Sequence, residues 1–501
     1  MLVAAGSLRQ AARDDDCGTE SSLRGLGIKA WLLIVGVFLA ARAGLLLRGV
    51  DFDFENLGTW WQIADPALLR DRLWATVVHL HGQPPLFNFL IGAALKTGEG
   101  GFPVVMAWTY GALSLAGILA FHALAAALLR SRRVALGLAL WFCVSPDVLL
   151  FNEKLFYDGL VPWLLCIGFW GVHAGLVRGR VGWLIVGFGA LAVVVLTRSM
   201  FHPIWFASVL ALALVLSRDR LRLVAGAALP GAAIAAVLVK NFVLFGFLGL
   251  SSWGVLNLVG VTVEKLPDAE RVALVADGTL SPLAGIDAFG PIERLLPLLG
   301  PIAATGEPVL DSLRKGNGQP NMHHEAMLVA SRQRLPDAIA ALRADPGMYA
   351  VVLTTSLFHF HRPANEFRDI RRNLARIEPW GRIANATVGL QPAAWFASSL
   401  DPARPDFFLL RISYGSVLIS IGFAAAGVGA LRRLRGAVAP DGVVLVLILW
   451  TGLFVFLLSS AFDVLENNRA RYTVAPLLTL GAAHWLVGRL RSRIAVAAPP
   501  P

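Results

Sequence analysis

Three carboxylates stand directly after the first long apolar segment of this chain: Asp51, Asp53 and Glu55. Carboxylates are costly in hydrocarbon and do not anchor a span, so their place at the mouth of one needs another reason. A carboxylate held at the membrane surface can act as a general base toward the hydroxyl of an acceptor. The same residues can instead hydrate the loop, or Asp51 and Asp53 can hold a divalent cation through oxygen ligands.

Two later turns carry further candidates. Asp158 directly precedes an apolar segment, where it can contribute to the electrostatics of a site or cap the helix that follows. Arg198 lies in a tight turn on the carboxylate-bearing side of the membrane, against the usual charge bias, so we expect an anion near it. The alternative is an arginine that snorkels toward the lipid headgroups.

A third set of candidates is basic and precedes the last apolar segment. Arg469 and Arg471 offer forked hydrogen-bond donors, which suit the oxygens of a phosphate. Anchoring at the membrane interface is the competing interpretation of these residues. His81, Gln83 and Tyr157 flank the acidic turns and are candidates to shape an acceptor site.

The elements that hold these residues are predicted to be membrane spans. Of the 501 residues 56% are hydrophobic, and several apolar runs reach the roughly 20 residues that cross a bilayer. The sequence therefore predicts an α-helical polytopic membrane protein, embedded in a lipid bilayer. The predicted spans are 28–48, 103–129, 134–151, 159–177, 181–197, 201–217, 223–245, 407–431, 442–462 and 472–489.

Arginine-rich connections alternate with carboxylate-bearing ones along the chain. The positive-inside rule places the arginine-rich connections, both termini and the tails 1–27 and 491–501 in the cytoplasm, with the first tail disordered. All the candidate residues then face the outer side. The arginine-rich composition indicates a GC-rich bacterial genome, and hence a bacterial cytoplasmic membrane.

Two regions are expected outside the bilayer. The first external loop, 49–102, belongs to the membrane core 28–245 and contains two surface helices, at 66–80 and 84–97. The second, 246–406, is expected to be a smaller mixed region with one secure helix at 325–344. Its apolar run 348–360 can re-enter the membrane, which gives ten or twelve spans in total, including those of the C-terminal part 407–490.

Other classes of protein are excluded by charge and cysteine content. The net charge of +11 comes from basic residues at the ends of spans rather than on one soluble face, so no nucleic-acid binding is expected. Cys17, Cys143 and Cys166 provide neither a disulfide framework nor the ligand spacing of a zinc site.

The layout resembles the GT-C superfamily of membrane glycosyltransferases, in particular the branch with protein O-mannosyltransferases and the aminoarabinose transferase of lipid A. Asp53 falls on the acidic position of that family's first external loop, and residues 83–86 (Gln-Pro-Pro-Leu) on its proline landmark. Asp158 matches an aspartate before a later span, and Arg471 matches an Arg-Tyr pair before the last one. Phe54 stands where the family has a second acid or a glycine, so the alternatives Asp51 and Glu55 stay open.

The resemblance implies transfer of a hexosyl or pentosyl group from a dolichyl- or undecaprenyl-phosphate donor to a hydroxyl or amine, with inversion, at the outer face. It implies Asp53 as base, Asp158 in support, and a lipid, polysaccharide or protein acceptor. Arg198, Arg469 and Arg471 would hold the donor phosphate. No cofactor is expected beyond a possible divalent cation.

Three other functions remain open. A transporter or flippase of a lipid-linked or anionic substrate would need ionisable residues deep in spans and internal repeats. A membrane scaffold would leave the matching landmarks without a role. A polymerase or ligase acting on diphosphate-linked donors would use similar residues for a related transfer.

Overall fold

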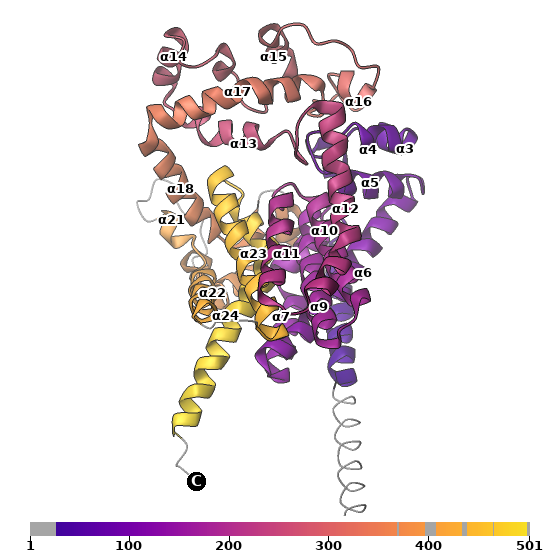
Figure 1. The fold of residues 1–501 in the computed structure, drawn as a ribbon, viewed down its shortest axis with the longest axis vertical. Helices are drawn as coiled ribbons and strands as arrows, with labels where there is room; N and C mark the ends of the chain where they lie inside the picture. The colour runs from indigo at the N-terminus through magenta and orange to yellow at the C-terminus, as the bar shows by residue number, and fades with distance from the viewer. Residues whose placement is uncertain (1–26, 368–369, 396–406, 433–437, 464, 498–501) are drawn as a thin grey trace, which may run out of the picture.

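The computed structural model describes residues 27–367, 370–395, 407–432, 438–463 and 465–497, and these are arranged almost entirely as helices. Within the described residues, β-structure is limited to two isolated bridges, Asp53 with Lys154 and Arg314 with Pro320. Figure 1 shows a long helical bundle with a separate layer of helices across one end, which we call the cap.

The bundle holds the long apolar helices. They are the first helix (Gly27–Leu47), α6 (Gly101–Leu129), α7 (Arg132–Val144), α8 (Pro146–Asn152), α9 (Val161–Arg178), α10 (Val181–Thr197), α11 (Pro203–Leu216), α12 (Arg220–Phe245), α22 (Tyr414–Leu431), α23 (Pro440–Phe462) and α24 (Asn467–Ala497).

The shorter helices lie toward the cap end. The first external loop forms α2 (Asn56–Thr59), α3 (Pro66–Asp71), α4 (Leu73–Val78) and α5 (Pro85–Leu95). The cap is α13 (Gly254–Val261), α14 (Asp268–Ala276), α15 (Ile292–Leu299), α16 (Pro308–Asp311) and α17 (Glu325–Ala344). The chain returns through α18 (Pro346–Phe360), α19 (Arg371–Leu374), α20 (Glu378–Thr387) and α21 (Phe407–Leu410).

The prediction of a polytopic α-helical membrane protein is confirmed. Among the described residues six helices are long and apolar enough to cross a bilayer, or seven if the bent pair α7 and α8 is one span. Eight of the ten predicted spans fall on one helix each, while 134–151 falls on α7 and α8 and 407–431 falls on α21 and α22. The count by length and composition is lower because α10 and α11 are short and α24 carries several arginines.

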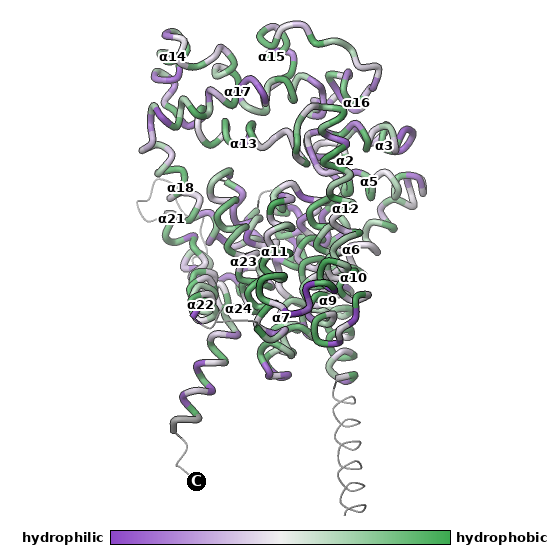
Figure 2. Tube along the Cα trace, in the orientation of Figure 1, coloured by the Kyte–Doolittle hydropathy of each residue, from purple (hydrophilic) through white to green (hydrophobic). Residues whose placement is uncertain are grey.

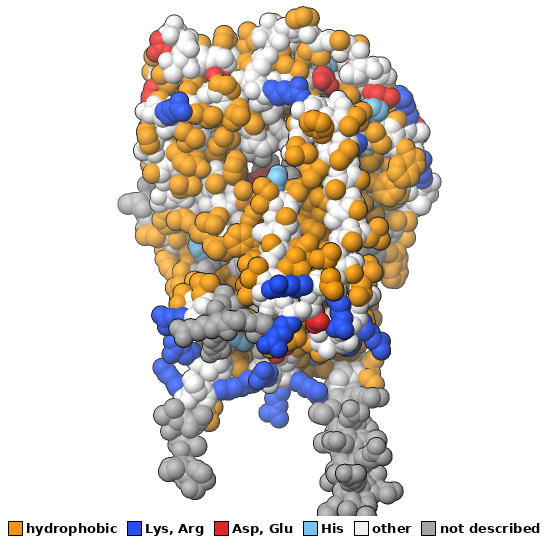
Figure 3. Space-filling view, in the orientation of Figure 1, with side chains coloured by type: hydrophobic (Ala, Val, Ile, Leu, Met, Phe, Trp, Pro, Cys, Tyr) orange, Lys and Arg blue, Asp and Glu red, His pale blue; other side chains and the backbone are white. Residues whose placement is uncertain are grey.

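The surface of the molecule has an apolar middle zone between two more polar ends, as expected for a membrane protein. The bundle helices are mainly hydrophobic in Figure 2, while polar residues gather in the cap and at the opposite end. Figure 3 shows a wide apolar band, a belt of Lys and Arg below it, and a hollow on this face between the bundle and the cap. On this face the belt lies at the end of the bundle where the first helix begins and α24 ends.

Two hydrophobic cores lie under these surfaces. The larger one joins the bundle helices and the first external loop. The smaller one belongs to the cap, where Trp253, Leu256, Leu295 and Met327 pack around α17. The cap therefore has a core of its own, and Val309 and Leu310 of α16 and Leu328 of α17 join it to the larger core.

One expectation about the external region is wrong. The described part of 246–406 is helical and contains no strand, although a mixed region was predicted. Its glycines and prolines divide it into short helices that pack on α17, and it has no alternating apolar run that would favour a strand. α17 itself has the predicted bounds, 325–344. The run 348–360 forms α18, which packs against α23 and α24. The predicted tail 1–27 lies almost wholly outside the described residues.

Candidate functional site

The turn between α8 and α9 carries the centre of the candidate site. It is fixed from α6, where the Tyr110 hydroxyl donates to the carbonyl of Phe156 at 2.7 Å and accepts the N–H of Phe156 at 2.9 Å. A side chain at Gly159 would begin 2.4 Å from the carbonyl oxygen of Phe151, so only glycine fits there. Tyr110 and Gly159 together fix the position of Asp158.

Asp53 is held against this same turn. Its N–H donates to the Glu153 carbonyl at 2.7 Å, and its carbonyl accepts the Leu155 N–H at 2.8 Å, like a short parallel bridge. Its carboxylate receives the Lys154 ammonium at 2.8 Å and the Glu55 N–H at 3.0 Å. Both charged side chains are buried, so each neutralises the other in a site that water barely reaches.

Asp158 forms a second ion-pair group. Its carboxylate is fully buried and contacts the guanidinium of Arg198, and Arg469 Nε lies 3.6 Å from its other oxygen. Arg469 also pairs with Glu466 at 2.5 Å. The predicted anion beside Arg198 is thus Asp158 itself, since the arginine compensates a carboxylate of its own chain.

Aromatic rings enclose both arginines. The guanidinium of Arg469 lies 4.8 Å from the Phe156 ring centre, 5.2 Å from Phe367 and 5.7 Å from Trp60. The guanidinium of Arg198 lies 5.3 Å from the ring of Tyr157. Such rings stabilise a cation through their faces and limit its motion. Trp60 also leads toward the cap, because its carbonyl accepts the buried Lys315 ammonium at 2.6 Å.

His81 joins the first external loop to the cap. Its Nε2–H donates to the carbonyl of His323 at 2.9 Å, so its Nδ1 is the atom that accepts the hydroxyl of Ser252 at 2.8 Å. Burial lowers the pKa of His81 to about 4. A Cβ on Gly82 would lie 2.6 Å from the Trp253 ring, so the cap sits directly on this loop.

The structure does not bring all the predicted residues together. Asp51 and Glu55 are exposed, and Asp51 lies 3.7 Å from Arg376. Gln83 is buried beside His81 in the cap interface, and Tyr157 is buried against Arg198. Of the three neighbouring carboxylates, only Asp53 is buried against the turn that carries Asp158.

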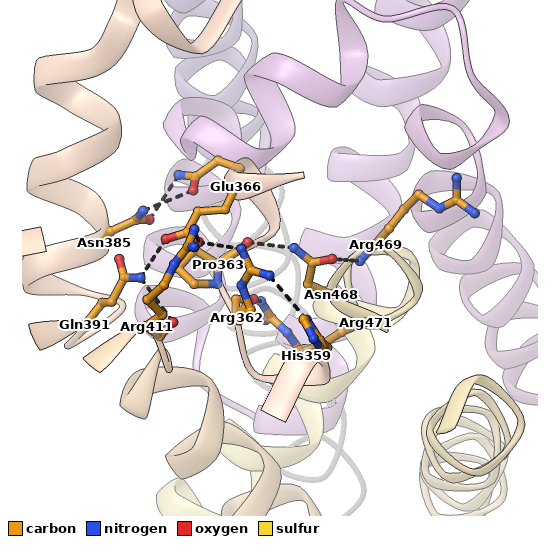
Figure 4. Close-up of polar contacts among 11 residues, drawn as sticks. His359, Arg362, Pro363, Glu366, Asn385, Gln391, Arg411, Asn468, Arg469 and Arg471 are labelled. Carbon is orange, nitrogen blue, oxygen red and sulfur yellow. Dashed lines mark hydrogen bonds and ion pairs between the residues drawn. The ribbon is translucent and has the colours of Figure 1, made fainter. Parts of the chain in front are cut away.

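Arg471 lies apart from the other two arginines. Residues two positions apart on a helix point to nearly opposite sides, and Figure 4 shows Arg469 and Arg471 directed differently from the start of α24. Arg471 donates to the carbonyls of Phe360 and Arg362 at 2.7 and 2.9 Å, so it holds the end of α18. In the same view Arg362 and Arg411 both pair with Glu366.

Lys154 is the site residue that sequence reasoning missed. It is a basic residue in a carboxylate-bearing external turn, the same departure from the charge bias that singled out Arg198. That signal was present in the sequence, but its partner Asp53 lies 101 positions away.

The two carboxylates predicted for a divalent cation each have a basic side chain beside them. The Lys154 ammonium lies 2.8 Å from Asp53, and Arg376 lies 3.7 Å from Asp51. Among the residues that the structure covers, no group of three or more His, Cys, Asp or Glu side chains could hold a metal ion.

No known family model and no curated protein matches the chain. The chain is similar to two solved membrane proteins. For the archaeal oligosaccharyltransferase AglB from Archaeoglobus fulgidus, in complex with an inhibitory peptide and a dolichol-phosphate, the identity is 14%, the coverage 94% of this chain and 52% of that one, and the TM-score 0.36. For ArnT from Cupriavidus metallidurans, bound to undecaprenyl phosphate, the identity is 12%, the coverage 94% of this chain and 81% of that one, and the TM-score 0.30. The chain spans about half the length of AglB, and TM-scores this low do not establish a common fold.

Proposed function

We propose that this protein is a membrane glycosyltransferase of the GT-C type, which transfers a sugar from a polyprenyl-phosphate donor to an acceptor hydroxyl or amine. One observation carries the proposal: Asp53 with Lys154, and Asp158 with Arg198 and Arg469, lie on one buried turn at the cap end of the bundle. The Lys and Arg belt lies at the other end, which by the positive-inside rule supports a site on the outer face. The arginine-rich composition supports the bacterial cytoplasmic membrane as its location.

The chemistry needs a single base. A polyprenyl phosphate is a good leaving group and departs without a proton, whereas glycosidases need two carboxylates because their leaving groups are poor. Asp53 takes the proton of the acceptor hydroxyl as the oxygen bonds to the anomeric carbon. The bond from that carbon to the phosphate oxygen breaks, and its electron pair leaves with the phosphate. One displacement of this kind inverts the anomeric centre.

Cations at the site stabilise the departing phosphate. Arg198 and Arg469 are held by Asp158 and by aromatic rings, so little reorganisation is needed when negative charge develops. Lys154 lies beside the base and can approach the phosphate when the acceptor takes its place at Asp53. Arg471, on the other side of α24, is not part of this set.

The test is transfer by the purified protein in detergent. Radiolabelled polyprenyl-phosphate mannose, glucose and aminoarabinose are supplied in turn, and release of free polyprenyl phosphate is measured along with transfer to lipid and water-soluble acceptors. We expect one donor to be cleaved and Asp53→Asn to lower kcat at least about 100-fold, the usual contribution of a general base. The exposed Asp51→Asn is the matched control and changes kcat by less than a few fold.

Three results would count against the proposal. Cleavage that persists unchanged in Asp53→Asn removes that residue as base. Cleavage that falls equally in Asp51→Asn assigns the base to the wrong carboxylate. Vectorial movement of the lipid across proteoliposomes, without any cleavage, identifies a transporter instead.

A further inference from the structure

A second polar site lies on the far side of α24 from the ion pairs. It is a cavity of about 110 Å³ between the bend that joins α7 to α8 and helices α20, α22 and α24. About 10–15 Å³ of such space admits one water molecule, so this cavity can hold a group of several heavy atoms. None of its polar residues takes part in the proposed transfer.

Three side chains of different chemistry face this cavity. Asp147 accepts the Asn365 N–H at 3.0 Å and interacts electrostatically with Arg471 and Tyr472. Arg471 lines the cavity, and its Nε and Nη2 donate to the carbonyls of Phe360 and Arg362 that hold the end of α18. The Tyr472 residue is only 3% exposed, so water does not reach its buried hydroxyl, and this hydroxyl has no hydrogen-bond partner.

A buried hydroxyl without a hydrogen-bond partner destabilises the fold, so the fixed position of the Tyr472 hydroxyl points to a ligand that supplies the missing partner. The Tyr472 ring is stacked on Phe151 at 4.1 Å, which prevents the hydroxyl from turning away. Ser145, Asn385 and Ser416 supply further polar groups around the same space.

The rim of the cavity is apolar and faces the lipid. Val388 is 49% exposed at the edge, and Trp141 and Ile419 beside it are partly exposed. α22 lies on the outside of the bundle, with 22% of its most apolar stretch buried. A ligand can therefore keep its hydrocarbon chains outside the bundle, beside α22, while its polar group enters the cavity.

We propose that this cavity binds the zwitterionic phosphate–amine headgroup of a membrane phospholipid. The phosphate accepts from Arg471 and Tyr472, and the ammonium donates to Asp147 and the neighbouring serines. A purely anionic headgroup would offer no cation to the partly buried Asp147 and would be repelled by its carboxylate. A quaternary ammonium has no N–H to donate to the carboxylate, so a primary amine fits better.

The test is lipid binding to the delipidated, purified full-length protein, followed by native mass spectrometry. Phosphatidylethanolamine, phosphatidylglycerol and phosphatidylcholine with identical dioleoyl chains are compared. We expect the Kd for phosphatidylethanolamine to be at least about tenfold below the other two. Tyr472→Phe and Asp147→Asn should each raise that Kd about tenfold, while Tyr349→Phe, whose hydroxyl is bound to the Ala461 carbonyl at 2.9 Å, leaves it unchanged.

Folding is not at risk in the main variant, because the Tyr472 hydroxyl has no partner to lose; the melting temperature of lipid-free Tyr472→Phe should equal or exceed that of the wild type. Competition with soluble phosphoethanolamine distinguishes a lipid headgroup from the free compound as the ligand of this cavity. If it competes only at far higher concentration than the lipid, the occupant is a lipid headgroup, and competition at equal concentration assigns the site to the free compound. Equal Kd values for the three lipids, or a Tyr472→Phe variant that binds as the wild type does, overturn the proposal.

Discussion

Asp53 and Asp158 are both buried, but their surroundings differ. Asp158 faces two arginines and has no exposed surface, which suits a residue that holds cations in place. Asp53 has one lysine partner and lies at the beginning of the external loop, which suits a group that gives up its partner during a reaction. The roles proposed for Asp53 and Asp158 therefore agree with the number of charged partners and the burial of each carboxylate.

Removing Arg198 should destabilise the protein strongly, because Asp158 would keep only the longer contact to Arg469. Loss of one partner of a buried ion pair typically costs about 3–5 kcal/mol. We expect Arg198→Gln to lower the melting temperature in detergent, and the double variant Arg198→Gln/Asp158→Asn to recover part of that loss. A double variant less stable than Arg198→Gln would show that the two side chains do not interact in this way.

Acid should weaken the junction between loop and cap through His81. Its pKa is lowered to about 4 from an ordinary value near 6.5, so the unfolded state binds the proton more readily between these values. Stability is thus fully present above about pH 6.5 and is lost as the pH falls toward 4, by at most about 1.4 kcal/mol per pH unit. His81→Gln keeps an N–H donor but does not titrate.

Melting temperatures at pH 7 and pH 5 provide the measurement. The fall on acidification should be smaller in His81→Gln than in the wild type, although the neighbouring His323, whose pKa is also lowered by burial, keeps part of it. An identical fall in both proteins would assign the acid sensitivity to other groups.

At the scale of elements, the hydropathy pattern predicted those helices that depend mainly on their own local sequence. Each apolar run became a helix because its length and hydropathy leave no other way to satisfy the backbone in hydrocarbon. α17 was found because the residues between His324 and Asp345, both of which cap helices, are mostly helix formers, although Pro336 lies among them. The folded form of 268–311 was not predicted, since its short helices depend on packing against α17.

The turn before α9 should not tolerate a larger residue at its glycine. A Cβ at Gly159 would also lie 2.9 Å from the Tyr110 ring, so Gly159→Ala must displace either the turn or α6. We expect a loss of about 1–3 kcal/mol in stability and a large fall in kcat, because Asp158 moves. Gly189→Ala in α10, where a Cβ meets nothing within 4 Å, is the control and should be neutral or stabilising. Wild-type kcat in Gly159→Ala would argue against a role for this turn.

At the scale of the whole molecule, the site depends on contacts that no sequence period encodes. Asp53 meets Lys154, and Asp158 meets Arg469, across more than a hundred and more than three hundred positions of chain. The sequence predicted the side of the membrane for these residues through charge alternation. It could not separate Arg471 from Arg469, because that depends on how α24 rotates against its neighbours.

A larger residue at Gly82, where the first external loop contacts the cap, should increase the motion of the whole cap. Gly82→Ala would press on the Trp253 ring at 2.6 Å, and because the cap has its own core, the displacement should spread through α13 and α17 rather than into the bundle. Hydrogen–deuterium exchange should rise in α13 and α17 and stay constant in α9 and α10. Gly254→Ala, with nothing within 4 Å, is the matched control. Faster exchange confined to α9 and α10 would contradict a separate cap.

The order of Asp158, Arg198 and Arg469 along the chain has a consequence for biosynthesis. Asp158 and Arg198 are translated early and can pair as soon as α9 and α10 have been inserted, but Arg469 follows the whole cap and two further long helices. The ribosome must synthesise the whole cap segment before α24 can close the group. A nascent chain that stalls inside the cap therefore lacks Arg469, so we expect the proposed transfer only when synthesis has passed the start of α24.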